Sequence, residues 1–525
     1  AFKLKPHGAS FQLASDRKFM WRVLTTDLEF GNDGSLYVAD WVNGWYGTGA
    51  GRVYRLFNPE TVLHEIPQIA HAELESATTV QLLNLLRHDD KRVRQRAQFA
   101  LAERDELESL LAFARSESRT IPRLHAIWGI GQIARRADVA TETIGMLTTD
   151  TDREIRAQTA RVLADFSQRR GAQQFLISLL EDMEPRVQMH AALSLARAGA
   201  EQAIPGLLRL LVHNNDRDPY VRHGAVMSLV GIGNVAALIG ALDDNPHRSV
   251  RLGVLLALRR MHRPEIARLL QDDDAQVVLE AARAIHDEPI DAALSEVADL
   301  TISPHLRRDN AVLDPLGRRV VNANFRLRRA APLVSLAADR DVRPAVRAHA
   351  LDALVDWETS SARDRVLGDY RPLSDHPNST DLTTLVEKHL DALLDGPPEV
   401  TAAAVGLASQ LTLKGLMPHL RSFLTDAETA PILRVAAVQA IAALEPVDAL
   451  DLLQTAVDDS DLQVRVAALT ALLEIDPSGA LPILNRAMDR GVWVEQQQAI
   501  AVLASLASPE ADSLLLAWPE QLWQG

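Results

Sequence analysis

Apolar residues recur with a helical period along most of the chain, from about residue 75 onward. An aliphatic residue is followed four positions later by a mostly small residue and eight positions later by another aliphatic one. Positions i, i+4 and i+8 lie on one stripe of an α-helix, and a small middle residue lets a neighbouring helix approach closely. The stripes are Val93/Ala97/Leu101, Pro122/Ala126/Ile130, Ile155/Thr159/Leu163, Val187/Ala191/Leu195, Val221/Ala225/Leu229, Val250/Val254/Leu258, Val277/Ala281/Ile285, Val346/Ala350/Leu354, Leu433/Ala437/Ile441 and Val464/Ala468/Leu472.

These stripes predict a repeat of two short antiparallel helices and two turns, because most successive starts are 27–34 residues apart. Aspartates cluster just before many stripes, where they can cap the following helix. An arginine follows the first apolar position of most stripes. The aspartate clusters are Asp89-Asp90, Asp150/Asp152, Asp216/Asp218, Asp243-Asp244, Asp272-Asp273-Asp274 and Asp458-Asp459, and the arginines are Arg94, Arg123, Arg156, Arg222, Arg251, Arg347, Arg434 and Arg465.

The combination of an acidic turn, a Val-Arg pair and a small-residue helix resembles HEAT repeats, over most of residues 75–515. In such repeats the aspartates and arginines form a ladder between neighbouring units, and we expect the same here. The alternative is an arginine ridge that binds a ligand. Residues 301–330 and 357–382 break the period. Insertions in solenoids often bind partners, but they are also tolerated as surface loops, and the pattern leaves both interpretations open.

Residues 1–57 follow a different pattern, with alternating apolar and polar positions and 11 of the chain's 24 aromatic residues. Gly-rich and Pro-containing turns separate the alternating segments, which is typical of β-hairpins. Five strands this short cannot bury a core of their own, so we expect the end of a larger β domain whose beginning is missing. The predicted strands are residues 2–5, 10–13, 27–30, 36–39 and 52–56.

The string Thr26–Trp41, which contains Asn-Asp-Gly-Ser-Leu-Tyr-Val-Ala-Asp-Trp, resembles a β-propeller blade. It is similar to the closing blades of bacterial sugar-dehydrogenase-like propellers. Together with Phe2–Phe11, Trp41–Trp45 and Gly49–Leu56, it resembles the PVC-type haem-binding proteins, also labelled membrane-bound dehydrogenase-like. Arg123–Trp128 and Asp364–Pro372 resemble the helical part of the same family.

In that family a propeller leads into HEAT repeats, and a c-type cytochrome domain with a Cys-x-x-Cys-His motif commonly ends the chain. The resemblance therefore implies a periplasmic or exported protein that oxidises a sugar or alcohol, with haem c, possible use of a quinone cofactor or calcium, and a cytochrome partner. This chain has no cysteine and only a blade's worth of propeller. We expect it to be an internal piece of such a protein, with no cofactor of its own and the chemistry elsewhere.

Composition excludes several other classes. The formal net charge of −15 argues against broad nucleic-acid binding, which needs a basic field. No run approaches 18 apolar residues, so we expect no membrane span, and no signal peptide is visible in the first residues. The sequence contains neither a Gly-x-x-x-x-Gly-Lys phosphate loop nor a Gly-x-Ser-x-Gly nucleophile elbow.

The candidate ligand contacts are Asp40, Trp41, Asn43 and Trp45, which follow a predicted strand. Loops at this position often line the funnel of a propeller. Asp and Asn oxygens can hold a metal or sugar hydroxyls, and Trp can stack on a sugar face. The alternative is a blade-closing turn with its aromatic residue packed between blades. We predict no catalytic residue and no metal ligands in this chain.

Histidines recur at roughly similar offsets in the predicted repeat helices, at His125, His190, His223 and His349. Neutral imidazole is a good ligand for a metal or for haem iron. These histidines come from different repeats, however, and we favour ordinary surface or partly buried side chains.

The sequence thus predicts a mainly α protein, a HEAT-repeat α-solenoid preceded by a short all-β fragment of a β-propeller. The solenoid would either be a rigid arm between a sugar- or alcohol-oxidising propeller and an electron acceptor, or a non-enzymatic scaffold that binds a protein partner on its surface. Whether the full-length protein is an enzyme stays open. The predicted boundaries are 1–60 for the closing blade or blades, 61–300, 331–356 and 383–525 for HEAT repeats, and 301–330 and 357–382 for irregular insertions.

Overall fold

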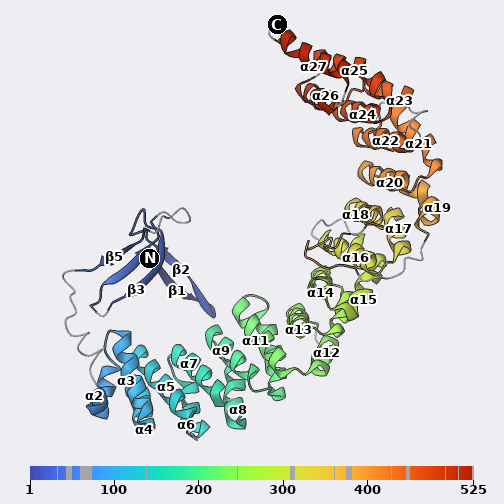
Figure 1. Ribbon diagram of the computed structural model, residues 1–525. Coiled ribbons are helices and arrows are strands. Elements are labelled where there is room, and N and C mark those ends of the chain that lie inside the picture. Colours follow the sequence, from blue (N-terminus) through green and yellow to red (C-terminus); the bar gives the residue numbers. More distant parts are fainter. Residues whose placement is uncertain are drawn as a thin grey trace. The chain divides into compact units, whose positions relative to one another are not determined.

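In the computed structural model, strands occupy the start of the chain and paired helices the remainder (Figure 1). The chain separates into two compact units, residues 1–263 (unit 1) and residues 264–525 (unit 2). The division falls inside the stretch 61–300 that the sequence predicts as one block of repeats. The structure describes residues 1–31, 33–42, 50–58, 74–137, 139–166, 168–244, 246–307, 314–359, 361–373, 381–426, 428–444, 450–490, 492–505 and 508–522.

Unit 1 begins with five antiparallel strands in two sheets. β1 pairs with β2, and β3, β4 and β5 form a second sheet in that order. The predicted strands are confirmed, although the first turn is tighter than expected and consists of Gly8 and Ala9, with Gly8 at a φ of 55° that favours glycine. The strands are β1 (Phe2–His7), β2 (Ser10–Asp16), β3 (Thr25–Phe30), β4 (Leu36–Asp40) and β5 (Arg52–Leu56).

The β1–β2 ribbon exposes apolar side chains. Phe2, Leu4, Phe11 and Leu13 are each about half exposed or more, and Leu4 lies opposite Leu13. A two-stranded ribbon has no second layer against which to bury such a face. Within the described residues, this apolar surface therefore remains largely open to solvent.

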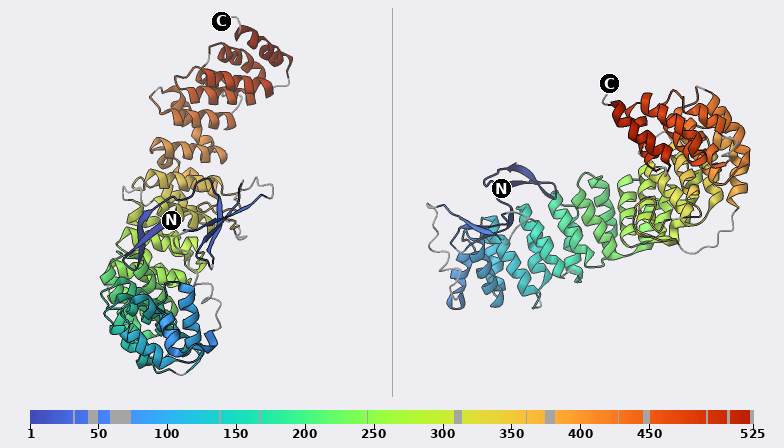
Figure 2. Two further views of the ribbon diagram at one scale, coloured as in Figure 1. Left: turned by 90° about the vertical axis from the view of Figure 1, so that its left-hand side faces the viewer. Right: turned by 45° about the horizontal axis from the view of Figure 1, so that its top comes forward.

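The remainder of unit 1 consists of helix pairs, and the second helices of successive pairs pack side by side in the order α3, α5, α7, α9, α11 and α13 (Figure 2). Short 3₁₀ turns continue or replace some first helices: η3 (Leu74–Ser76), η4 (Met146–Thr149), η5 (Ala164–Phe166) and η6 (Glu201–Ala203). The α-helices are α2 (Thr79–Leu85), α3 (Lys91–Glu103), α4 (Leu107–Ser116), α5 (Thr120–Ala134), α6 (Thr141–Gly145), α7 (Arg153–Leu163), α8 (Arg170–Leu179), α9 (Pro185–Ala196), α10 (Ile204–Asn214), α11 (Pro219–Ile232), α12 (Val235–Asp244) and α13 (Arg248–Arg260).

Unit 2 repeats the same pairing, and its second helices pack in the order α14, α16, α18, α20, α22, α24 and α26. Its 3₁₀ helices are η7 (Pro264–Gln271), η8 (Asp291–Ala293), η9 (Asp299–Ile302), η10 (Pro304–Leu306) and η12 (Lys414–Leu416). The α-helices are α14 (Ala275–Asp287), α15 (Leu294–Ala298), α16 (Asp314–Arg326), α17 (Ala330–Ala338), α18 (Pro344–Val355), α19 (Leu382–Leu394), α20 (Pro398–Gln410), α21 (Met417–Thr425), α22 (Pro431–Leu444), α23 (Leu450–Ala456), α24 (Leu462–Ile475), α25 (Pro477–Arg490), α26 (Trp493–Ser505) and α27 (Pro509–Leu522).

The predicted stripes all lie on second helices. Val93, Ala97 and Leu101 of α3 are buried, as are their counterparts on most other second helices. The preceding aspartate caps the helix where a cap was predicted for α3, α7, α11 and α14. The prediction is wrong at Asp243 and Asp244, which belong to α12, while His247 precedes α13 without a side-chain cap.

The prediction of an irregular insertion over residues 301–330 is also wrong in part, because α16 occupies 13 of these residues. The buried stripe of α16 is Leu316, Val320 and Asn324, so an amide stands where the pattern requires an aliphatic residue. Asn324 Nδ2 donates to the carbonyl oxygens of Ala298 and Val320 at 2.8 and 2.9 Å. Because Asn324 is polar, apolar periodicity does not reveal the buried stripe of α16. The described part of 357–382 that precedes α19 contains no helix.

The ladder expected between repeats is present at several positions. Arg156 of α7 donates through Nε and Nη2 to both carboxylate oxygens of Asp182, at 2.7 and 2.9 Å. The two side chains are 16% and 9% exposed, so the pair is largely withdrawn from water. Two further pairs join neighbouring repeats in the same way, Arg123–Asp150 and Arg434–Asp459.

Most of the other predicted arginines bind acceptors close to the start of their own helices, whereas Arg347 donates to the carbonyl oxygen of Ala337 near the end of α17. Arg94 donates to the carbonyl oxygens of His88 and Asp89, both at 2.7 Å. Every arginine of the series is therefore held by protein groups, which supports the structural interpretation over a ligand-binding ridge. The remaining contacts are Arg222–Asp216, Arg251–Pro246, Arg347–Ala337 and Arg465–Asp459.

The Arg156–Asp182 pair can be tested by the substitution R156Q. We expect it to lower the free energy of local unfolding of α7 and α9 by about 2–3 kcal/mol, because Asp182 is left partly buried without its cation. Amide hydrogen exchange resolved to these helices measures the change. The matched control is R209Q, which breaks the exposed Arg209–Glu181 pair (55% and 66% exposed) and should cost less than about 1 kcal/mol. Equal effects of both substitutions would contradict the assignment.

Candidate functional site

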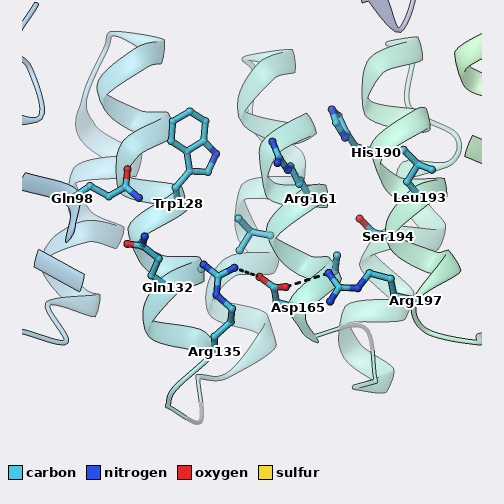
Figure 3. Close-up of a pocket in the computed structure, with 13 residues that line it drawn as sticks. Gln98, Trp128, Gln132, Arg135, Arg161, Asp165, His190, Leu193, Ser194 and Arg197 are labelled. Carbon is cyan, nitrogen blue, oxygen red and sulfur yellow. Dashed lines mark hydrogen bonds and ion pairs between the residues drawn. The ribbon is translucent and has the colours of Figure 1, made fainter. Parts of the chain in front are cut away.

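A groove of about 700 Å³ runs across the second helices of unit 1 (Figure 3). Trp128 and Gln132 of α5, Arg161 of α7, and His190 and Leu193 of α9 contribute to its lining. A smaller cavity of about 340 Å³ adjoins it and shares Gln132 and Arg135 with it. This cavity reaches Phe99 of α3. The groove therefore extends over four successive repeats.

The repeat itself aligns the lining residues. Trp128, Arg161 and Leu193 each lie six positions after the first apolar residue of their own stripe, and Phe99 of the adjoining cavity has the same offset. Because the stripes of neighbouring second helices pack against each other, equal offsets come side by side. Apolar periodicity alone does not reveal this row, but the residues at this offset stand out when successive repeats are aligned.

An aspartate shared by two arginines forms one end of the groove. Asp165 of η5 accepts from Arg135 at 2.9 Å and from Arg197 at 3.4 Å (Figure 3). Asp165 is mostly shielded, whereas the two arginine side chains are more than half exposed. Most guanidinium N–H groups of this cluster consequently remain available to solvent or to a ligand.

Arg161 of α7, one helical turn before Asp165, adds a third cation to the groove. Its side chain is exposed, and no carboxylate in the described part of the chain lies within ion-pair distance of it. The groove therefore carries three arginines against one aspartate, although the whole chain has a net charge of −15. Gln132 Oε1 and His190 Nε2 are shielded from water and have no hydrogen-bond partner among the described residues.

Hydrogen bonds between repeats hold the groove wall in place. Trp128 Nε1 donates to Gln158 Oε1 at 3.0 Å, and Gln158 Nε2 donates to Glu154 Oε1 at 2.9 Å. Glu154 Oε2 then accepts from Arg186 Nε at 2.9 Å. This chain of contacts crosses α5, α7 and α9. It fixes the indole orientation before any ligand arrives.

His190 of the groove lining and His125, whose ring packs against Trp128, are uncharged at neutral pH. Burial, with a smaller contribution from the positive charge of Arg94, lowers the pKa of His125 to about 4. His125 Nδ1 lies 2.8 Å from Gln98 Oε1, which fits a neutral ring with the proton on Nδ1. Burial, followed by the charges of Arg186 and Arg161, lowers the pKa of His190 to about 4 as well.

The first hairpin contacts the helices beside the groove. The Ala9 N–H donates to Asp218 Oδ2 at 2.7 Å, while Oδ1 of the same carboxylate caps α11. Arg186 Nη1 donates to the Ala9 carbonyl oxygen at 3.4 Å, and its guanidinium lies 5.2 Å from the centre of the Phe11 ring. A Cβ at Gly8 would clash with Asp218. The hairpin tip is thus fitted to the start of α11 and to Arg186 of α9, which lies one helical turn before His190.

The predicted ligand contacts are placed only in part. Asp40 is buried at the end of β4, where Oδ1 accepts from Leu24 N at 2.8 Å and Oδ2 from Tyr54 OH at 3.3 Å. Trp41 follows it and is about one-third exposed. Asn43 and Trp45 lie outside the described residues. Both oxygens of Asp40 are engaged by internal donors, and the ligand site at this turn stays a prediction.

The other predicted histidines lie apart from this wall. His223 on α11 is exposed, and His349 on α18 of unit 2 is half-buried, with burial lowering its pKa. The described residues contain no group of three or more His, Asp or Glu side chains placed to hold a metal ion.

A second polar cluster, in unit 2, anchors the predicted insertion at residues 357–382. His286 of α14 lies 2.8 Å from Asp287 through Nδ1 and 2.8 Å from Asn322 Nδ2 through Nε2. Asn322 Nδ2 also donates to Asp364 Oδ2 in the insertion, at 2.9 Å. Burial raises the pKa of Asp364, but main-chain N–H donors, the nearby imidazole and Asn322 outweigh it, and the net pKa is lowered. Arg319 closes the network by a bidentate contact with Asp287.

This network links the insertion to α14 and α16 through protein groups. Leu367 and Tyr370 remain exposed on the insertion. The binding of a partner by this loop stays a prediction. No helix of the described chain has the length and apolarity that crossing a lipid bilayer demands.

Comparison with known proteins supports the repeat assignment. The family model for HEAT repeats matches residues 140–229 of unit 1 and 417–504 of unit 2, so the helix pairs in these two stretches are HEAT repeats. No curated protein matches this chain. Two crystal structures of engineered proteins are 19% and 24% identical, with TM-scores of 0.25 and 0.26; they cover 81% and 41% of this chain and 99% and 98% of their own. A homology model of the full-length AP-3 complex in an intermediate open conformation is 9% identical, with a TM-score of 0.34, and covers 86% of this chain and 92% of that one.

The lowered histidine pKa values predict a pH dependence of unit 1. An unfolded histidine titrates near 6.5, whereas folded His125 and His190 titrate near 4. Between these values the unfolded chain binds more protons, so stability falls as the pH is lowered from about 6.5 to about 4. We expect H125Q/H190Q to lose less stability than the unsubstituted protein between pH 7 and pH 5. Urea unfolding followed at both pH values measures this, and an unchanged loss in the double variant would contradict it.

Proposed function

We propose that the protein is a HEAT-repeat scaffold that binds another protein through the groove of unit 1. The observation that carries the proposal is a row of residues at the same offset in their repeats, one from each of four neighbouring helices. The row consists of Phe99, Trp128, Arg161 and Leu193. Solenoid repeats commonly use such aligned positions as an extended binding surface.

The chemistry of the row suits recognition of a protein. Trp and Arg are the residues most often found to dominate binding energy at protein interfaces, and Trp128 and Arg161 lie next to each other in this row. The indole of Trp128 is already held by Gln158. A partner therefore meets a preformed surface and loses less free energy in ordering it.

A finer role rests on the resemblance of residues 1–57 to dehydrogenase-like propellers. We propose that the repeats form an arm between a sugar- or alcohol-oxidising propeller and an electron acceptor such as a cytochrome. The protein would then be periplasmic or exported, with haem c and possible use of a quinone or calcium elsewhere in the full-length chain. The exposed apolar face of the β1–β2 ribbon favours this role, because further strands packed on it would bury that face.

Site-specific photo-crosslinking tests the scaffold role. A photoreactive amino acid replaces Phe99, which is exposed beside the groove, in the intact protein within its own cells. We expect one or a few discrete protein adducts, identified by mass spectrometry. The same amino acid at Arg209, on first helix α10, is the matched control and should give none of them. Adducts of equal yield from both positions, or none from Phe99, would argue against the groove as the binding surface.

The finer role predicts the surrounding coding sequence. We expect further Asp-Gly-x-Leu-Tyr-Val blades upstream and a Cys-x-x-Cys-His motif downstream, and a haem Soret band in the protein purified from its source. If sequencing finds neither flanking motif and the purified protein has no Soret band, the dehydrogenase-linked role is wrong while the scaffold role stands.

A further inference from the structure

We propose that the groove of unit 1 binds an extended acidic segment of the partner protein, with carboxylate side chains on its arginines and an apolar side chain between Trp128 and Leu193. This inference rests on the proposed function and specifies the chemistry of its partner.

The first support is charge. Three arginines and one aspartate line the groove in a chain whose net charge is −15. Asp165 is the shared partner of Arg135 and Arg197, and it occupies one of the N–H donors of each. An arginine guanidinium has five such donors, so both can bind a second carboxylate without breaking the contact with Asp165.

The second support is the state of Arg161. It lies on α7, between the helices that carry the other two cations, is exposed, and has no carboxylate within ion-pair distance among the described residues. The neighbouring imidazole of His190 is neutral at pH 7 and offers no competing charge. A carboxylate bound to Arg161 therefore gains an ion pair without displacing an existing one.

The third support is the shape of the surface. Trp128 and Leu193 flank Arg161 on the two neighbouring helices, which places apolar surface on both sides of the central cation. The adjoining cavity continues the row to Phe99. An extended chain, whose side chains alternate in direction, can place acidic and apolar residues in turn along such a row.

A nucleic acid is the competing anionic ligand. Three arginines can neutralise only a few phosphates, and the acidic field of the remaining chain repels a longer polyanion. A short acidic peptide needs few contacts and supplies the apolar side chains that Trp128 and Leu193 can cover. These properties favour a peptide.

Fluorescence anisotropy with the full chain tests the proposal. The probe is a short fluorescein-labelled peptide in which Asp and Glu alternate with Leu, and the comparison peptide carries Asn and Gln instead. We expect the acidic peptide to bind at least about tenfold more tightly at about 50 mM NaCl, and the preference to shrink at about 300 mM. Single-stranded oligothymidylate of equal charge should bind more weakly than the acidic peptide.

Substitutions assign the binding to the groove. R161Q and R197Q should each weaken the acidic peptide about tenfold, and R161E should weaken it further because it adds repulsion. These side chains are exposed, so the variants should fold, which circular dichroism checks. R209Q on α10 is the control and should leave affinity unchanged.

Three results would overturn the proposal: equal binding of the amide peptide, tighter binding of oligothymidylate, or unaltered affinity in both R161Q and R197Q. If the Phe99 crosslinks persist in any of these cases, the scaffold role survives and only the acidic chemistry is wrong. If the crosslinks are absent too, the groove is not the partner surface.

Discussion

Close packing of the second helices is the constraint on which the remaining structure depends. Small residues such as Ala97, Ala126 and Ala191 occupy the middle of the buried stripes and let adjacent helices approach. Between α9 and α11 the approach is so close that a Cβ added at Gly231 would collide with the main chain of Ala196. Helices packed this tightly have little freedom to slide or rotate. Equivalent positions in successive repeats are therefore brought into rows, and one of these rows is the groove.

Most of the helical architecture could be predicted because it rests on apolar periodicity. The strands were equally accessible, since alternation and Gly-containing turns mark their ends. Helix α16 could not be found in this way, because Asn324 is buried through hydrogen bonds and leaves no apolar signal. The predicted cap at Asp243 failed for another reason. Its position at the end of α12 depends on how far that helix extends, which the sequence pattern does not show.

The candidate groove was less accessible to sequence reasoning than the fold. Arg161 and Trp128 are unremarkable in their own helices, and they become neighbours only through the packing of α5 against α7. The ladder arginines attracted attention because they recur, but recurrence reflects their structural contacts, as in the pairing of Arg156 with Asp182. At the offset that forms the groove, the residue type changes from one repeat to the next, as from Phe99 to Leu193. These differing side chains give the surface its specific chemistry. Asp40 shows the reverse case, because its position after a strand suggested a ligand, while the structure gives it two internal donors.

The contact between Ala9 and Asp218 changes the mechanics of unit 1. A linear repeat array touches only its neighbours, so it can open from either end one repeat at a time. Here a hydrogen bond joins residues 209 positions apart, and Arg186 adds a second attachment through Phe11. The hairpin tip therefore joins α9 and α11 through contacts that are separate from the packing of the two helices against each other. Fraying at α11 must then break these contacts before it can spread to α9, so the two helices share one cooperative transition, whereas helices that the hairpin does not touch remain free to open singly.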